Sequence, residues 1–428
     1  MSKKLDVYLR DDLVGHFVQD DHGDVAFSYA ESWLENVAAI PLSQSLPLRQ
    51  ERFSRKECRG FFAGLLPEQS MREIIAHILG ISAKNDFKML EQIGGECAGA
   101  VTFMPAGEPL PKQEQGYRKL SDEELFDILR ELPRRPLLAG NKDIRLSLAG
   151  AQAKLPVHVF EGQISLPQSG APSTHILKPA NERFEGLVFN EAFCMKLAAL
   201  VGLPVANTAI GSIGGLDYLL VERFDRKTDL RIRAPRPWPY TERWHQEDFC
   251  QALGIVPELK YQNEGGPSLQ QCFQLLRDAS DVPVVDVLAL LNAVIFNFLI
   301  GNHDAHSKNF SLLYGEPVLG RRTRLAPFYD LVSTVYYPDL TPKMAMKIGG
   351  EYMSGKIRPK HFEHLAEEAG LGKAQVIQRV PALAQAILDH LDKVHIDHKV
   401  AYEVATLIRN RCEETLLKFQ APKPPKMP

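Results

Sequence analysis

The sequence predicts an α+β fold that begins with a small β-rich subdomain and ends in an all-α C-terminal lobe. Short runs of alternating apolar and polar residues dominate the first half of the chain, and such alternation is typical of strands. From residue 249 onward apolar residues recur mostly at helical spacing. A proline-containing stretch at 104–111 separates the first strands from the rest, which indicates a domain boundary near residue 105.

Length and composition limit the class of protein. A chain of 428 residues suggests two or three domains. Hydrophobic content of 45% and charged content of 24% are ordinary for a soluble globular protein. The net charge of −3 gives no global electrostatic reason to bind nucleic acid. The six cysteines form no C-x-x-C pair, so we expect neither a disulfide framework nor a cysteine-built zinc site. We expect the protein to lie in a reducing cytoplasm.

Two segments bear on targeting. The N-terminus lacks the apolar region of a secretory signal. The apolar run from Val287 to Ile300 has 14 residues and contains Asn292 and Asn297, so it is too short and too polar to span a bilayer. We predict a buried core helix there, no membrane association and a cytoplasmic protein.

Residues 1–105 are predicted to form the N-terminal subdomain. Alternation at 5–9, 13–17 and 25–27 indicates a small antiparallel sheet. Helical spacing from 58 to 90 is interrupted by Pro67, and 101–103 returns to strand character. Residues 106–142 are a linker followed by a helix, which begins after the capping box of Ser121 and Glu124.

Residues 143–225 are predicted to form a nucleotide-binding region. Residues 144–159 are expected to form a strand, a turn of small residues and a second strand, and small residues at Ala149 to Ala151 would let the backbone approach phosphates. The same pattern also suits a plain hairpin turn. A short strand at 174–179 presents Lys178, either to solvent or to phosphate oxygens.

The rest of this region adds a helix and a strand. A helix is expected to open at Asn190 and Glu191, where Glu191 either pairs with Lys178 or favours the helix N-terminus. The apolar strand at 217–225 is expected to be buried within a sheet. Backbone groups around Glu222 to Phe224 could form hydrogen bonds with a nucleotide base.

Residues 226–420 are predicted to form the helical C-terminal lobe. A loop at 226–243 carries Arg231, Arg233 and Arg236 and is expected to be a surface excursion toward an acidic partner. Amphipathic helices follow, with one strand near 343–347 and a bundle over 362–417. The tail 421–428 is expected to be disordered.

The stretch from Asn302 to Asn309, Asn-His-Asp-Ala-His-Ser-Lys-Asn, carries the candidate chemistry. Asp304 would accept a proton while the amide oxygen of Asn309 reaches a metal ion. Asp330 supplies a second acid after a strand-like segment at 324–326. Alone, this spacing more often belongs to turn and capping groups. Together with Lys178 upstream, the order of the parts indicates phosphoryl transfer.

Two other interpretations remain open. An adjacent His303 and Asp304 followed by His306 would suit a metal-dependent phosphohydrolase. A catalytically idle binding module, acting only as a corepressor, would retain the same residues without turnover.

Several motifs resemble those of a known family over nearly the whole chain: 45–48, 65–67, 93–101, 147–154, 174–178, 221–226, 246–251, 304–309 and 327–330. The chain resembles HipA-type serine/threonine kinases, the toxins of type II toxin–antitoxin (HipBA) systems. This resemblance implies a two-lobed protein-kinase-like fold, with Asp304 as the catalytic base and Asn309 and Asp330 as Mg²⁺ ligands. It also implies these ATP-binding residues: Ala149, Gly150, Ala151, Gln152, Ala153, Lys154, Lys178, Glu222, Phe224, His306, Lys308, Asn309, Tyr329 and Asp330.

The resemblance further implies regulation and partners. Ser147 matches the serine that HipA-like kinases autophosphorylate, and a phosphate there would add about −1.5 to −2 charge. The implied partners are a small HipB-like DNA-binding antitoxin, operator DNA through that complex, and a protein substrate such as an aminoacyl-tRNA synthetase. The basic residues at 355–360 would either touch operator DNA or form a solvated turn.

Overall fold

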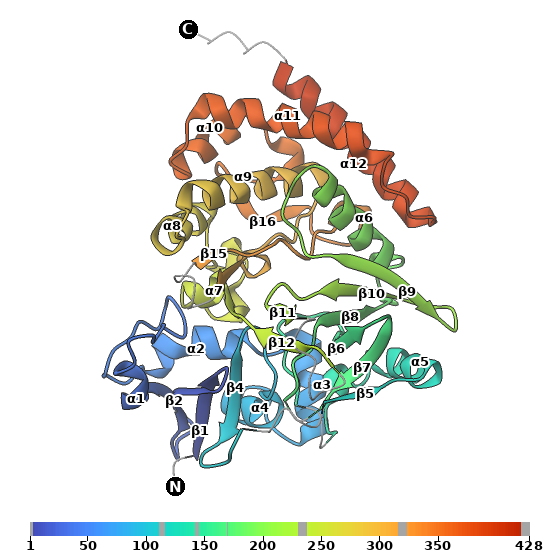
Figure 1. Cartoon of the computed structure of the whole chain (residues 1–428). Helices are drawn as coiled ribbons and strands as arrows, with labels where there is room; N and C mark the ends of the chain where they lie inside the picture. The colour runs from blue at the N-terminus through green and yellow to red at the C-terminus, as the bar shows by residue number, and fades with distance from the viewer. Residues whose placement is uncertain are drawn as a thin grey trace. The chain divides into compact units, whose positions relative to one another are not determined.

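The computed structural model describes residues 3–110, 116–141, 145–168, 170–229, 238–315 and 323–420 (Figure 1). The contacts divide the chain into two compact units. The first unit comprises Met1–Ala180, Thr208–Leu259 and Ser311–Ala326, and the second comprises Asn181–Asn207, Lys260–Phe310 and Pro327–Pro428. The predicted domain boundaries are not tested by this division and stay predictions.

The first unit begins with an antiparallel sheet in the order β3-β2-β1-β4, as the alternation predicts. Its strands are β1 (Lys3–Leu9), β2 (Asp12–Gln19), β3 (Val25–Tyr29) and β4 (Val101–Pro105). Its helices are α1 (Glu31–Leu34), α2 (Arg55–Gly64), α3 (Gln69–Leu79) and α4 (Asp86–Ile93). Aromatic packing fills the core between sheet and helices, where Phe17 stacks on Phe62 with ring centroids 4.1 Å apart.

A six-stranded antiparallel sheet in the order β5-β7-β6-β8-β10-β9 follows in the same unit. Its strands are β5 (Tyr117–Lys119), β6 (Leu155–Phe160), β7 (Gln163–Pro167), β8 (His175–Pro179), β9 (Thr208–Ile213) and β10 (Leu216–Glu222). Helix α5 (Asp122–Glu131) begins at the predicted Ser121 capping box. The predicted strands around Lys178 and Leu219 are confirmed as β8 and β10.

Two predictions for the first unit are wrong. The predicted hairpin at 144–159 does not form in its described part, 145–159: Leu146 and Gly150 make isolated bridges to Glu96 and Pro67, and β6 is the one strand in that part. The flanks of the 226–243 segment are paired strands, β11 (Arg226–Asp229) and β12 (Tyr240–Arg243), and their terminal arginines are buried. Residues 230–237, with Arg231, Arg233 and Arg236, lie outside the described residues, as does the tail 421–428.

The first unit ends with a small sheet and short helical turns. Strands β13 (His245–Asp248), β14 (Ser311–Tyr314) and β15 (Thr323–Leu325) pair in that order. Helix α7 (Phe249–Ala252) follows β13 directly, capped by Asp248. Helix α7 packs against α2, so this later segment of the chain lies against an N-terminal helix.

The second unit is predominantly helical, as predicted. It contains α6 (Leu187–Leu200), α8 (Leu269–Ala279), α9 (Pro283–Ile300), α10 (Pro359–Glu368), α11 (Lys373–Leu391) and α12 (Lys399–Gln420), with a hairpin of β16 (Lys343–Ile348) and β17 (Glu351–Met353). Helix α6 starts three residues before the predicted Asn190, so Glu191 lies inside it and not at its start.

Helix α9 is the core element of the second unit. It packs against α8, α11 and α12, and it begins at Pro283, four residues before the predicted start. Within the described part of the chain, it is the helix whose length and apolar composition would suit a membrane span, but 67% of that window is buried inside the protein. Packing on several sides explains why its sequence is apolar all round.

Candidate active site

The end of α9 sets the position of the 302–309 loop in the second unit. Gly301 adopts a left-handed conformation with φ +73° and closes the helix. A Cβ atom at this position would lie 2.4 Å from a Val335 methyl group, so glycine is needed for both conformation and space. The chain therefore leaves the buried helix abruptly and enters the polar loop.

Asn302 connects both segments that carry the candidate acids. Its side-chain NH₂ donates to Oδ1 of Asn297 at 2.8 Å and to the main-chain oxygen of Asp330 at 3.4 Å. Its side-chain oxygen accepts from the main-chain N–H of Asp304 at 3.1 Å. Asn302 is 2% exposed, so this neutral amide is a buried link between the 302–309 loop and Asp330. The sequence analysis gave Asn302 no role.

Asp304 is exposed and oriented by neighbours. The hydroxyl of Tyr261 donates to its Oδ1 at 2.8 Å. The side-chain NH₂ of Asn309 donates to its main-chain oxygen at 3.1 Å. With the NH₂ group used in this way, the amide oxygen of Asn309 is the atom that would bind a cation. Sequence reasoning missed Tyr261, which lies 43 positions before Asp304.

Asp330 lies in a second loop of the same unit. It has φ +54°, a left-handed conformation that non-glycine residues rarely adopt, and such backbone strain is concentrated at functional sites. The preceding Phe328 is fixed by a parallel bridge to Val205. Tyr329 donates its hydroxyl to the main-chain oxygen of Lys308 at 2.9 Å, which ties this loop to the 302–309 loop.

The donor set suits Mg²⁺, which prefers oxygen ligands and is held in kinases by few protein groups plus phosphates. Asn309 and Asp330 would supply one amide and one carboxylate oxygen. Among the residues that the structure describes, no three His, Cys, Asp or Glu side chains group closely enough to hold a metal ion. The phosphohydrolase interpretation needs such a group.

The two histidines of that alternative serve other contacts. The ring of His303 pairs with Oγ of Ser354 at 2.8 Å and with the main-chain oxygen of Thr341 at 3.4 Å. Burial, and secondarily the charge of Arg411, lowers the pKa of His303 to about 4. His306 is buried and packs edge-on against the Tyr261 ring at 5.4 Å. Both histidine rings therefore make contacts that stabilise the fold.

The candidate nucleotide residues of the first unit occupy three segments. In the first segment, Ser147 is fully buried and donates its hydroxyl to the main-chain oxygen of Leu65 at 2.8 Å. The N–H of Glu68 donates to the oxygen of Gly150, whose φ of +111° suits glycine. Lys154 donates its ammonium to the oxygen of Ala149 at 2.5 Å and so closes the turn. Residues 149–154 are all half-buried.

The second and third segments are strands. Lys178 is 5% exposed in β8, opposite Leu219 of β10, and so is not a solvated edge lysine. Glu222 is exposed at the end of β10, and Phe224 follows it half-buried.

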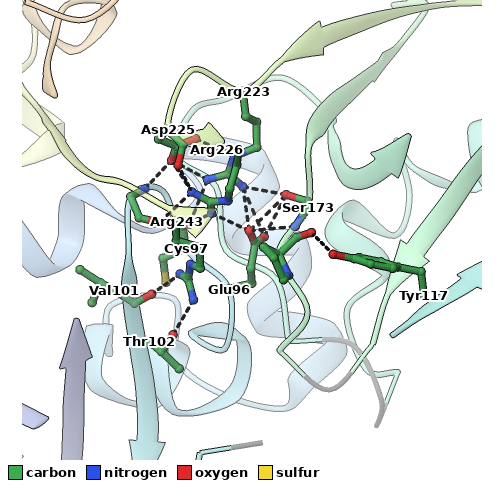
Figure 2. A network of polar contacts seen from close by, with 12 residues as sticks. Glu96, Cys97, Val101, Thr102, Tyr117, Ser173, Arg223, Asp225, Arg226 and Arg243 are labelled. Carbon is green, nitrogen blue, oxygen red and sulfur yellow. Dashed lines mark hydrogen bonds and ion pairs between the residues drawn. The ribbon is translucent and has the colours of Figure 1, made fainter. Parts of the chain in front are cut away.

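A buried ionic cluster contacts these nucleotide-binding segments (Figure 2). Sequence reasoning missed it entirely. It contains Glu96, Arg223, Asp225, Arg226 and Arg243, all less than 10% exposed. The guanidinium of Arg223 donates to Glu96 at 3.0 Å and to Asp225 at 2.8 Å, and that of Arg226 donates to Glu96 at 2.6 Å. Burial raises the pKa of Glu96, but the neighbouring arginines outweigh this and hold it below its usual value.

Two family models match the chain. The HipA N-terminal domain matches residues 5–104, and the HipA-like C-terminal domain matches residues 146–391. The protein Y4mE of Sinorhizobium fredii is 46% identical over 404 residues, which is 93% of both chains. The serine/threonine-protein kinase toxin HipA of Shewanella oneidensis is 30% identical over 434 residues, which is 96% of both chains.

The fold has a counterpart among solved structures. The complex of Shewanella oneidensis HipA and HipB with its operator DNA contains a chain that matches with a TM-score of 0.82 and 29% identity, covering 97% of this chain and 98% of that one. This confirms the predicted α+β, kinase-like architecture with its helical C-terminal region. The chain therefore belongs to the HipA family of serine/threonine kinases.

Proposed function

We propose that this protein transfers the γ-phosphoryl group of ATP to a serine or threonine hydroxyl, with Asp304 as the base and Mg²⁺ as the cofactor. The observation that carries this proposal is that Asn302 links the main chains of Asp304 and Asp330, while Asn309 binds the main-chain oxygen of Asp304. These bonds would hold a base and two cation ligands in one unit. Both family models and the kinase toxin of Shewanella oneidensis support it.

Each candidate site residue has a proposed role in catalysis or binding. Asp304 accepts the proton of the substrate hydroxyl as its oxygen attacks phosphorus, and Tyr261 orients the carboxylate. Lys178 and the 149–154 segment bind the phosphates, and backbone groups between Glu222 and Phe224 bind the base. The family resemblance also assigns His306, Lys308 and Tyr329 to nucleotide binding. Bound Mg²⁺, held by Asn309 and Asp330, would offset the negative charge that develops on the phosphate oxygens.

The test is transfer of labelled phosphate by dephosphorylated protein with Mg²⁺, comparing wild type, Asp304→Asn and Asp330→Asn. We expect Asp304→Asn to lower transfer by about 10²- to 10⁴-fold while ATP still binds, and Asp330→Asn to lose Mg²⁺-dependent transfer. Wild-type protein that binds ATP but transfers nothing would favour the idle corepressor instead.

Ser147 is proposed as a self-inhibition switch. Its buried hydroxyl donates to Leu65, and a phosphate with about −1.5 to −2 charge would not fit in that place. Phosphorylation would therefore release the 146–154 segment. Mass spectrometry after incubation with ATP should find phosphate on Ser147 in wild type and none in Asp304→Asn. Prolonged incubation that leaves Ser147 unmodified in active wild type contradicts the switch.

The biological setting is proposed from the relatives. The matching structure contains HipA, HipB and operator DNA, so we propose a HipB-like antitoxin as partner and operator DNA as a target of the joint complex. The substrate would be a translation protein such as an aminoacyl-tRNA synthetase, in the cytoplasm. All six cysteines lie among the described residues, are buried and form no disulfide, which agrees with a reducing compartment. Co-purification with the antitoxin, followed by binding to operator DNA, tests the partner proposal.

A further inference from the structure

We infer that Glu96 is a positioning residue for the nucleotide: this one residue of the N-terminal region aligns all three nucleotide-binding segments of the first unit. The inference rests on the proposed function, because it takes the roles of residues 149–154, Lys178 and Glu222 to Phe224 from there. Glu96 is 1% exposed and therefore acts through these segments and not by touching the nucleotide.

The main chain of Glu96 fixes the first segment. Its N–H donates to the oxygen of Arg145 at 2.8 Å, and its oxygen accepts from the N–H of Ser147 at 2.9 Å. These two bonds form a parallel bridge centred on Leu146. The bridge ends two residues before Ala149, so the position of Glu96 sets where the 149–154 turn begins.

The side chain of Glu96 reaches the second segment through Ser173. Oε1 of Glu96 accepts from the hydroxyl of Ser173 at 3.1 Å and from its N–H at 3.3 Å. Ser173 is fully buried and lies two residues before β8, the strand that carries Lys178. The carboxylate therefore anchors the start of the lysine strand.

The same carboxylate fixes the third segment through two arginines. Arg223 and Arg226 donate to Oε1 of Glu96 at 3.0 and 2.6 Å. Arg223 directly follows Glu222 and precedes Phe224, so the segment that would contact the base is held at its centre. Figure 2 shows the carboxylate with Ser173 on one side and both guanidinium groups on the other.

A charged residue is required for this arrangement. The cluster contains three guanidinium groups (Arg223, Arg226 and Arg243) and two carboxylates (Glu96 and Asp225). Arg223 and Arg226 bind the carboxylates, whereas Arg243 donates to Thr102 and to the Val101 oxygen. Replacing Glu96 by a neutral residue leaves an additional buried positive charge without compensation, and the segments would shift to relieve it. Displacement by about 1 Å is enough to lower catalytic efficiency by about 10²-fold.

The test compares Glu96→Gln with a matched control, Asp86→Asn, in the full chain. Asp86 is also a buried carboxylate, 5% exposed, and its side chain binds Arg59 at 2.8 Å and Arg72. Both arginines lie outside the three nucleotide-binding segments. Both variants should be less stable than wild type. At a temperature where all are folded, calorimetry with Mg²⁺ and a non-hydrolysable ATP analogue should show at least ~10-fold weaker binding for Glu96→Gln alone.

Kinetics separate positioning from general destabilisation. For Glu96→Gln the KM for ATP should rise, with kcat at saturating ATP close to wild type, and Glu96→Asp should recover part of the affinity. If Glu96→Gln does not fold, Ser173→Ala removes the link to the Lys178 strand without changing charge and should weaken binding by a few-fold.

Equal affinity in wild type and the folded Glu96 variants, or an equal loss in Asp86→Asn, would overturn the inference. Its failure differs from that of the proposed function. The kinase proposal fails if wild type transfers no phosphate. The Glu96 inference fails if substitution of Glu96 leaves the affinity for the ATP analogue unchanged. Wild type that binds no nucleotide overturns both.

Discussion

The ionic cluster of the first unit buries arginines and carboxylates against one another, whereas the 302–309 region of the second unit uses neutral groups and leaves one carboxylate exposed. Around Glu96, three arginines and two carboxylates are almost completely buried. Around Asp304, the supporting groups are two amides and a phenol, from Asn302, Asn309 and Tyr261. Because buried charge is costly unless paired, the first arrangement makes geometry rigid. The second leaves the Asp304 carboxylate accessible to solvent.

The largest effect should come from breaking the ionic cluster. Arg223→Met removes the arginine that donates to both Glu96 and Asp225, and leaves these buried carboxylates without those hydrogen bonds. We expect the free energy of unfolding to fall by about 3–5 kcal/mol, measured by urea denaturation. The matched control is Arg118→Met, which breaks an ion pair with Glu124 whose side chains are 43% and 46% exposed. That change should leave the free energy of unfolding close to that of wild type, because water screens an exposed ion pair. Similar losses in the two variants would contradict the comparison.

A second prediction concerns Glu247, a carboxylate buried without an arginine partner. It accepts hydrogen bonds from Ser43, Gln44 and Tyr314. Burial raises its pKa to about 7, even though these bonds lower it. The folded protein therefore holds the proton more tightly than the unfolded chain. This contribution to stability is complete below about pH 4.5 and is lost as the pH rises to about 7.

Glu247→Gln keeps the hydrogen-bonding shape without the ionisable group. At pH 8 the variant should be more stable than wild type by up to about 3 kcal/mol, since a shift of one pKa unit corresponds to about 1.4 kcal/mol. At pH 4.5 this advantage should vanish. Urea denaturation of both proteins at pH 8 and pH 4.5 measures this difference in stability. A stability difference that is the same at both pH values would contradict the raised pKa of Glu247.

The third prediction tests whether a neutral group, the Asn302 amide, aligns the two loops of the second unit. Asn302→Ala removes the links to Asp304 and Asp330. Phosphoryl transfer should fall by about 10²-fold because two loops lose their alignment, and buried partners left unsatisfied should cost about 1–3 kcal/mol of stability. Asn292→Ala, another asparagine of the same helical region, serves as the control and should retain transfer.

The smallest effect should come from Tyr261→Phe, which deletes one hydroxyl and keeps the ring packed against His306. Transfer should fall by about 10-fold, since a hydrogen bond to a charged group is worth about 1.5 kcal/mol at the low end of its range and Asp304 is exposed. Loss as large as that of Asp304→Asn would mean that the phenol itself takes part in proton transfer.

Local patterns in the sequence predicted most elements but not their long-range partners. The Ser121 capping box and the apolar run of α9 are local signals, and both helices form. The predicted hairpin at 144–159 fails because the alternation around Leu146 pairs with Glu96 instead of with a neighbouring strand. The segment 226–243 was predicted to be a surface loop, but Arg226 and Arg243 at its ends lie in paired strands, where Glu96 and the Val101 carbonyl bind them.

The candidate site shows the same limit. Motif order led to the prediction of Asp304, Asn309 and Asp330 as site residues, because they lie within one stretch of chain. Tyr261 and Glu96 gave no local signal, since their contacts span 43 and 127 positions. Asn302 was detectable in principle, because it begins the polar stretch directly after the apolar helix.

The most direct measurement is the unfolding free energy of Asp304→Asn together with its rate of phosphate transfer, at pH 7 with Mg²⁺. An exposed carboxylate used for chemistry should leave stability within about 0.5 kcal/mol of wild type while transfer falls by about 10²-fold or more. A variant that loses more than about 1 kcal/mol and still transfers phosphate at the wild-type rate would show that Asp304 is a structural group, contrary to this account.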